Sequence, residues 1–261
     1  MPASWSLTPP YILAFGFLCG IVGFRMGWRT GNRFALPLVQ GGVGWVGFLM
    51  GWTLLGPGWA AAAVGAWAVG STVASVYVFL GRPAEADARV IRAPAYRAEM
   101  LEWLAAGKGP ETHPGATILR HVRELIWYAA AAVLTGNAAS IVMGAVLLNY
   151  MNVWVATLLR AAKRTAVVLA MAWNVWSVVR VAAYVSIGAA LAGPVLRWLG
   201  FGVDAASARR LGIAGAAGAA LDLTLKLALS RPCGRVLGSA VDLDAASANR
   251  SSEVPLSLHL D

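Results

Sequence analysis

The sequence has little charge, little cysteine and little histidine. Asp, Glu, Lys and Arg make up 13% of its 261 residues, against about 25% in an ordinary soluble domain. This composition excludes a soluble globular protein of this length. The two cysteines, Cys19 inside an apolar run and Cys233 near the C-terminus, provide neither a disulfide framework nor a thiolate metal site. His113 and His121 match no metal-binding His pair, so we expect no metal and no cofactor.

Acidic residues are scarcer than basic ones, which gives a formal net charge of +9. The arginines cluster at the ends of apolar runs. That pattern is typical of positive charge anchoring a membrane protein on the cytoplasmic side, rather than of a surface that binds nucleic acid. Hydrophobic residues make up 59% of the chain. We therefore expect an integral membrane protein, with the lipid bilayer as a partner and no nucleic-acid partner.

Long uncharged runs predict the first membrane spans. Residues 1–24 carry no charge and are followed by Arg25, Arg29 and Arg33, so we expect a retained span that runs from outside to inside. The next uncharged run, 34–81, contains one strong turn signal at Gly56-Pro57-Gly58 and predicts a hairpin of two spans. The N-terminus is then expected to lie outside.

The segment 82–124 is the only sizeable polar stretch before the tail, and its arginines predict a cytoplasmic location. Residues 96–105 repeat apolar side chains at helical spacing. Residues 117–124 are amphipathic, with Arg120, His121 and Arg123 opposite the apolar side chains, and we expect them to lie along the inner membrane surface.

The following uncharged run, 125–159, is too long for one comfortable span and short for two. A break at Thr135-Gly136-Asn137 would give a half-helix and a re-entrant turn. Alternatively, residues 125–148 form one span and residues 149–164 form an interfacial helix. The second interpretation would place Arg160 to Arg164 outside, against the distribution of positive charge, so the sequence leaves both alternatives open.

The apolar run 165–196 carries one arginine, Arg180, at its middle, and Pro194 marks its expected end. An arginine at the centre of a membrane helix costs about 2.5–3.5 kcal/mol on insertion scales, so it should face other helices or a wet cavity. Asn174, Ser177 and Tyr184 share its arc of the helix. This arc is a candidate intramembrane polar site, and a helix-packing stripe is the alternative interpretation.

The last apolar helix is expected at residues 211–229 and contains Asp222 and Lys226 at i, i+4 spacing. Asp222 can be neutralised by Lys226, or it can pair with Arg180 and lock the two helices together. Both residues therefore join the candidate polar site. Residues 231–261 are polar and lack periodicity, which predicts a flexible tail.

Part of this helix resembles the signature of CDP-alcohol phosphatidyltransferases. Asp204, Ala208, Arg209, Gly218 and Asp222 have the spacing of that motif, D-x2-D-G-x2-A-R-x8-G-x3-D-x3-D. The resemblance implies a lipid-modifying enzyme whose carboxylates hold divalent metal. However, Phe201 replaces the first carboxylate, Ala205 the motif glycine, and Lys226 the last carboxylate, which is the expected general base. A lysine replaces neither a metal ligand nor that base.

We expect an all-α polytopic transmembrane bundle of about six spans, with five to seven allowed, in a bacterial inner membrane. Its units are expected at 1–81, 82–124, 125–230 and 231–261. Glycine-rich helix faces and the lack of a complete catalytic set favour a non-catalytic subunit or scaffold that contacts other membrane proteins or itself. A transporter or channel that uses Arg180 and Asp222 is the alternative, and a lipid-modifying enzyme comes third.

The expected orientation can be tested by cysteine labelling. A cysteine placed at Thr112 should resist an impermeant thiol reagent in intact cells and react after lysis, because the segment 82–124 is expected inside. A cysteine at Gly58, in the turn expected outside, is the matched control and should react in both conditions. Ready labelling at position 112 in intact cells would show that the topology is the inverse of the one expected.

Overall fold

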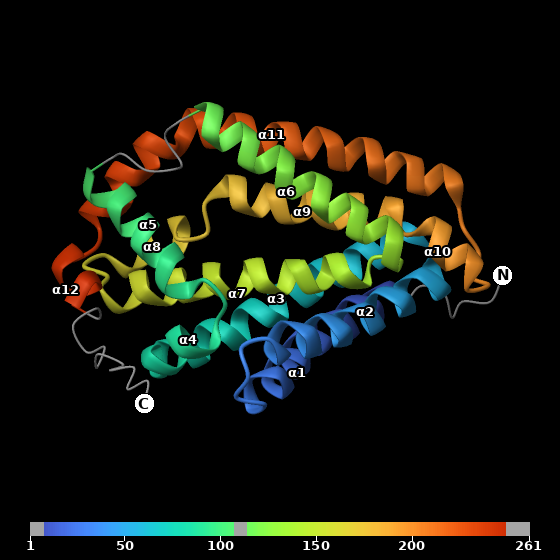
Figure 1. The fold of residues 1–261 in the computed structure, drawn as a ribbon, viewed down its shortest axis with the longest axis horizontal. Coiled ribbons are helices and arrows are strands. Elements are labelled where there is room, and N and C mark those ends of the chain that lie inside the picture. The colour runs from blue at the N-terminus through green and yellow to red at the C-terminus, as the bar shows by residue number, and fades with distance from the viewer. Residues whose placement is uncertain (1–7, 107–113, 249–261) are drawn as a thin grey trace, which may run out of the picture.

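The computed structural model describes residues 8–106 and 114–248, and these form a bundle of long helices (Figure 1). Six segments are long and apolar enough to cross a membrane, which confirms the all-α polytopic class. They are α1 (Thr8–Arg29), α2 (Ala35–Leu55), α3 (Pro57–Gly81), α7 (Ala138–Arg160), the broken segment Thr165–Trp198, and α11 (Ala205–Ser239).

Helices α1, α2 and α3 pack closely because small residues lie where their backbones approach. A Cβ atom at Gly70 of α3 would overlap the carbonyl oxygen of Phe17 in α1, and one at Gly20 would overlap that of Trp67. Glycine thus permits the close backbone contact typical of membrane helices. The turn between α2 and α3 is at Gly56, whose φ of 91° favours glycine.

Tryptophan side chains of this unit donate hydrogen bonds to backbone carbonyl groups. The indole N–H of Trp67 in α3 donates to the carbonyl of Gln40 in α2 at 3.2 Å. Trp52 donates to Gly202 at 2.9 Å, and Trp45 donates to Gly136 at 3.0 Å. The last two bonds join α2 to distant turns of the chain.

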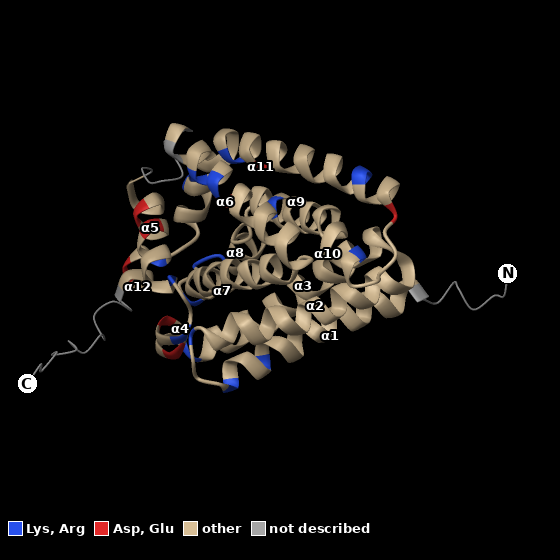
Figure 2. Ribbon diagram, turned by 45° about the vertical axis from the view of Figure 1, so that its right-hand side comes forward, with Lys and Arg blue, Asp and Glu red and all other residues tan. Residues whose placement is uncertain are grey.

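Two short helices, α4 (Pro83–Arg89) and α5 (Ala93–Ala106), cover one end of the bundle. Figure 2 shows that charged residues gather on these helices and are sparse along the spans. The guanidinium of Arg97, with 3% of its side chain exposed, holds both carboxylate oxygens of Asp87 at 2.6 and 2.7 Å. Because Arg29, Arg82 and Arg160 also lie where α1, α3 and α7 end, we call this the basic end.

Helix α6 (Pro114–Thr135) corrects the expectation for residues 117–124. These residues do not form a separate surface helix; they begin α6, which continues to Thr135 and packs along α7 and α9 (Figure 1). The apolar side chains of Leu119 and Val122 are exposed, whereas His121 is buried. His121 therefore faces the bundle while Arg123 stays exposed, so only part of the polar face of this amphipathic helix turns inward.

The break proposed at residues 135–137 is present, and the chain reverses there. Gly136 and Asn137 have φ values of 58° and 73°, so α6 ends and α7 returns. This corrects the interfacial helix expected at 149–164, because Asn149 and Asn152 are buried in the bundle. Asn149 donates to Gln40 at 2.8 Å, and Asn152 donates to Ser75 at 2.6 Å.

The reversal also places the arginines that end α7 at the basic end. Arg160 donates to the carbonyl of Phe79, near the end of α3, at 2.7 Å. A single span over residues 125–148 would have placed Arg160 on the side opposite the other arginines. Instead, α6 leads away from the basic end and α7 returns to it, so Arg160 lies with the other arginines.

The run expected as one helix over 165–196 is broken instead. It forms α8 (Thr165–Met171), α9 (Val175–Leu191) and α10 (Gly193–Trp198). Asn174 is extended, with φ −53° and ψ 141°, and precedes the first residue of α9. Arg180 consequently lies in the second turn of α9 rather than at the middle of a long helix. Pro194 lies in the first turn of α10, where proline is compatible with a helix, and does not end the run.

Helix α11 begins at an Asp204 cap, whose carboxylate accepts from the backbone N–H groups of Ala206 and Ser207 at 3.1 Å. The Ser207 side-chain hydrogen bond, with these backbone bonds, lowers the pKa of Asp204. The helix runs through Arg231 and Pro232 to Ser239, and α12 (Leu243–Ala248) follows. The tail expected from residue 231 therefore does not begin there; its last part, 249–261, lies outside the described residues, as do 107–113, including His113 and Thr112.

The close contact of α1 with α3 can be tested with two alanine substitutions. Gly70→Ala should lower the thermal midpoint in detergent, because overpacking of a tight contact costs about 1–3 kcal/mol. Gly65→Ala on the same helix is the matched control and should change little, because a Cβ there meets no atom within 4 Å. Equal midpoints for the two variants would contradict the packing described.

Candidate functional site

A bidentate ion pair joins α9 to α11 inside the bundle. Arg180 Nε lies 2.8 Å from Asp222 Oδ2, and Arg180 Nη2 lies 3.2 Å from Asp222 Oδ1. The Asp222 carboxylate is fully buried, and 20% of the Arg180 side chain is exposed. The pairing of these two residues, one of the two alternatives drawn from the sequence, is thus present. A parallel fork of N–H groups on a carboxylate is the strongest geometry available to an arginine.

Helix α6 adds a third group, His121, to the same carboxylate. His121 Nε2 lies 3.2 Å from Asp222 Oδ2, and the His121 side chain is 7% exposed. We call Arg180, Asp222 and His121 the charge centre. The sequence did not indicate this position of His121, because the polar face of residues 117–124 was expected in water. The apolar face on the other side of the helix could have indicated it, since such a face can contact lipid in a membrane protein.

A polar cavity of about 40 Å³ opens beside the charge centre. Arg92, Arg120, Arg180 and Lys226 line it, with Glu124 as the facing carboxylate. Lys226 is 7% exposed and lies one helical turn beyond Asp222. A water molecule needs about 10–15 Å³ by a comparable measure, so the cavity holds a few waters or a small charged group. Its lining carries more cationic than acidic side chains, although Arg92 and Arg120 contact Glu99 at 3.4 and 3.8 Å.

A second small cavity, of about 50 Å³, shares Tyr150, Met151 and Arg180 with the first. Tyr184 and Ser177, which were expected on the polar arc of α9, line this inner cavity. The rings of Tyr184 and Tyr128 lie 4.8 Å apart. Asn174, the remaining member of the arc, precedes α9 and lines neither cavity.

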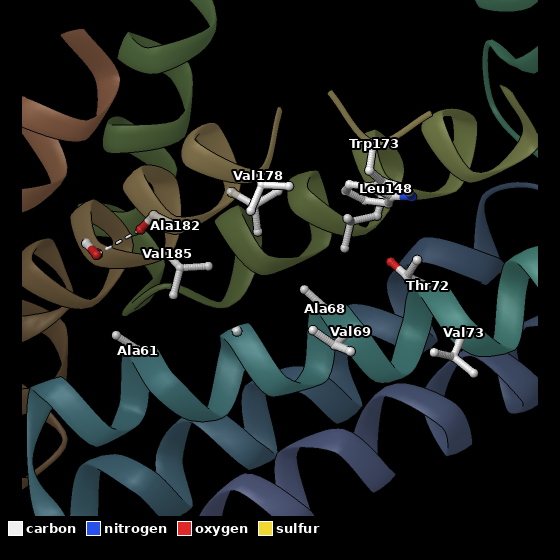
Figure 3. A pocket seen from close by; sticks show the side chains of 13 residues that line it. Ala61, Ala68, Val69, Thr72, Val73, Leu148, Trp173, Val178, Ala182 and Val185 are labelled. Carbon is white, nitrogen blue, oxygen red and sulfur yellow. Dashed lines mark hydrogen bonds between the residues drawn. The ribbon is translucent and has the colours of Figure 1, made fainter. Parts of the chain in front are cut away.

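A lateral groove of about 540 Å³ adjoins the inner cavity, and α3, α7 and α9 form its walls (Figure 3). Its lining is almost entirely apolar, as Val69, Val178 and Leu148 illustrate. The groove and the inner cavity share the side chains of Ala68, Leu148, Val181 and Val185.

The structure separates the carboxylates of the phosphatidyltransferase resemblance. Asp204 caps the exposed start of α11, and Asp222 lies 18 positions further along the same helix, which is about 27 Å at 1.5 Å per residue. Among residues 8–106 and 114–248, no three His, Cys, Asp or Glu side chains form a cluster that could hold a metal ion. The two aspartates therefore do not form a shared metal site.

The fold and these cavities define an integral, multi-pass membrane protein with a charged centre between its helices. Comparison of the chain with protein-family models, with curated proteins and with solved structures gives no match.

A double-mutant cycle tests the charge centre. Asp222→Asn should destabilise the protein in detergent by about 3–5 kcal/mol, because it leaves Arg180 without this buried carboxylate. Arg180→Gln should cost a similar amount, because it leaves the fully buried Asp222 with the His121 contact in place of the bidentate pair. The double variant should recover part of the loss. Strictly additive changes in the unfolding midpoint would show that the two side chains do not interact.

Proposed function

We propose that this membrane protein is a carrier for an anionic group, which binds at Arg180 in the charge centre. The observation that supports the proposal is the fully buried Asp222, compensated by side chains from two other helices and placed beside a cationic cavity. Ionisable residues at such positions are rare in membrane proteins and typically mark a substrate or ion pathway.

An anion can compete with Asp222 for the guanidinium of Arg180. Asp222 occupies the Nε and Nη2 groups, and an arginine has five N–H donors in a fixed fork. When an anion takes part of this fork, Asp222 keeps fewer hydrogen bonds from Arg180. His121 contacts the same carboxylate and remains as its second partner.

A non-catalytic subunit role is the second candidate. It was favoured by glycine-rich faces, but Gly20, Gly41, Gly51 and Gly70 all contact other helices of this chain. A protein partner could cover the apolar outer side of α11, where Ile213 is 62% exposed. Lipid suits that surface equally well, so it does not distinguish the subunit from the carrier.

The carrier function can be measured in reconstituted vesicles by two parallel assays. One follows release of trapped inorganic phosphate, and the other follows movement of a fluorescent phosphatidic acid between leaflets. We expect one of these fluxes to exceed that of protein-free vesicles. Arg180→Gln should reduce it at least about tenfold, the effect of losing one charge-assisted hydrogen bond.

Arg164→Gln is the control, because Arg164 is exposed and bonds Ser239 away from the charge centre. It should leave the flux unchanged. The carrier proposal fails if neither flux exceeds the protein-free level, or if Arg180→Gln and Arg164→Gln behave alike. Co-purification of a stoichiometric membrane protein together with an absent flux would favour the subunit role.

A further inference from the structure

The lateral groove, the inner cavity and the polar cavity lie in a row, and each shares lining residues with the next. The groove and the inner cavity have Val181 and Val185 in common, and the inner and polar cavities have Arg180 in common. The row thus passes from an apolar surface to a cationic interior. This is the order of polarity found along a membrane lipid, from its chain to its headgroup.

The groove has the dimensions of one lipid chain. Along α3 its lining extends from Ala61 to Val73, which is about 18 Å at 1.5 Å per residue. One leaflet of the hydrocarbon core is about 15 Å thick, half of the roughly 30 Å slab. Val69 and Val73 are more than half exposed and face the surroundings of the bundle, so the groove is open at its side.

The charges at the other end of the row select the headgroup. Four cationic side chains and one carboxylate, Glu124, line the polar cavity. Arginine forks match the oxygen geometry of a phosphate, which makes a phosphate the favoured anion. The polar cavity and the inner cavity have volumes of only about 40 and 50 Å³, so they suit a small headgroup rather than a bulky one.

We propose that the lateral groove binds one acyl chain of an anionic phospholipid whose small phosphate headgroup is held by Arg180 and the polar cavity. The inference rests on the proposed anion binding at Arg180 and not on transport. It identifies the lipid itself as the anionic ligand of the charge centre.

The site can be tested by photolabelling of the full chain in vesicles. Phosphatidic acid and phosphatidylcholine that carry the same diazirine-labelled acyl chain are compared, and the labelled peptides are identified by mass spectrometry. Phosphatidic acid should label the segments 61–73 and 178–186 about tenfold more than phosphatidylcholine, the selectivity of one charge-assisted hydrogen bond. Equal labelling of these segments by the two lipids would overturn the proposal.

Two glycine substitutions separate the groove from the general lipid surface. Gly65→Leu should fill the groove and reduce labelling by phosphatidic acid to the phosphatidylcholine level, because Gly65 lines the groove and a Cβ there meets open space. Gly42→Leu is the matched control, since Gly42 also has open space and does not line the groove. Unchanged labelling of Gly65→Leu would also overturn the proposal.

Headgroup recognition is tested by Arg180→Gln, which should abolish the preference for phosphatidic acid. If that variant does not fold, Arg120→Gln provides the same test at a partly exposed side chain and should reduce the preference. Selective labelling without any flux would support the lipid site and overturn the carrier proposal. Phosphate release that depends on Arg180, without selective labelling, would overturn the lipid site and support the carrier proposal.

Discussion

The compensation of one buried carboxylate governs how the second half of the chain is arranged. Asp222 has no exposure, and its two oxygens contact Arg180 on α9 and His121 on α6. An unpaired charge in hydrocarbon would cost several kcal/mol, so α6, α9 and α11 must stay in register for Asp222 to keep its partners. These contacts also place Arg180 beside the inner cavity and the polar cavity. The same constraint therefore orders the helices and creates the cationic surface.

The first half of the chain is held together by a different force. Helices α1, α2 and α3 approach through glycine, where a side chain at Gly20 or Gly70 would overlap a neighbouring backbone. Such packing depends on van der Waals contact, because hydrocarbon provides no hydrophobic drive between helices. Helix α3 carries this tight face on one side and lines the lateral groove with Val69 and Val73 on the other. Helix α3 thus packs tightly against α1 and faces α9, the helix that carries Arg180, across the groove.

The sequence was sufficient to predict the membrane class and the three spans before residue 82, because length and the absence of charge are local properties. It also supplied Arg180 and Asp222 as potential partners, since intramembrane charges have few others. It could not place His121, because the amphipathic pattern of α6 is the same whether its apolar face meets lipid or core. Nor could it predict the break at Asn174, because residues 165–187 contain no proline or glycine. Both features depend on tertiary contacts.

The polar contacts of the bundle differ in what they contribute beyond stability. The pairs Asn149 with Gln40 and Asn152 with Ser75 link helices through neutral groups, and such bonds contribute about 0.6–2 kcal/mol in membranes. A charged centre is not needed for that purpose, because well-packed apolar residues often replace a buried ion pair without loss of stability. The residues around Asp222 also line cavities, whereas Asn149 and Asn152 line none of the cavities described above. Packing alone therefore does not account for the charges, and this is the reason for proposing an anionic ligand at Arg180.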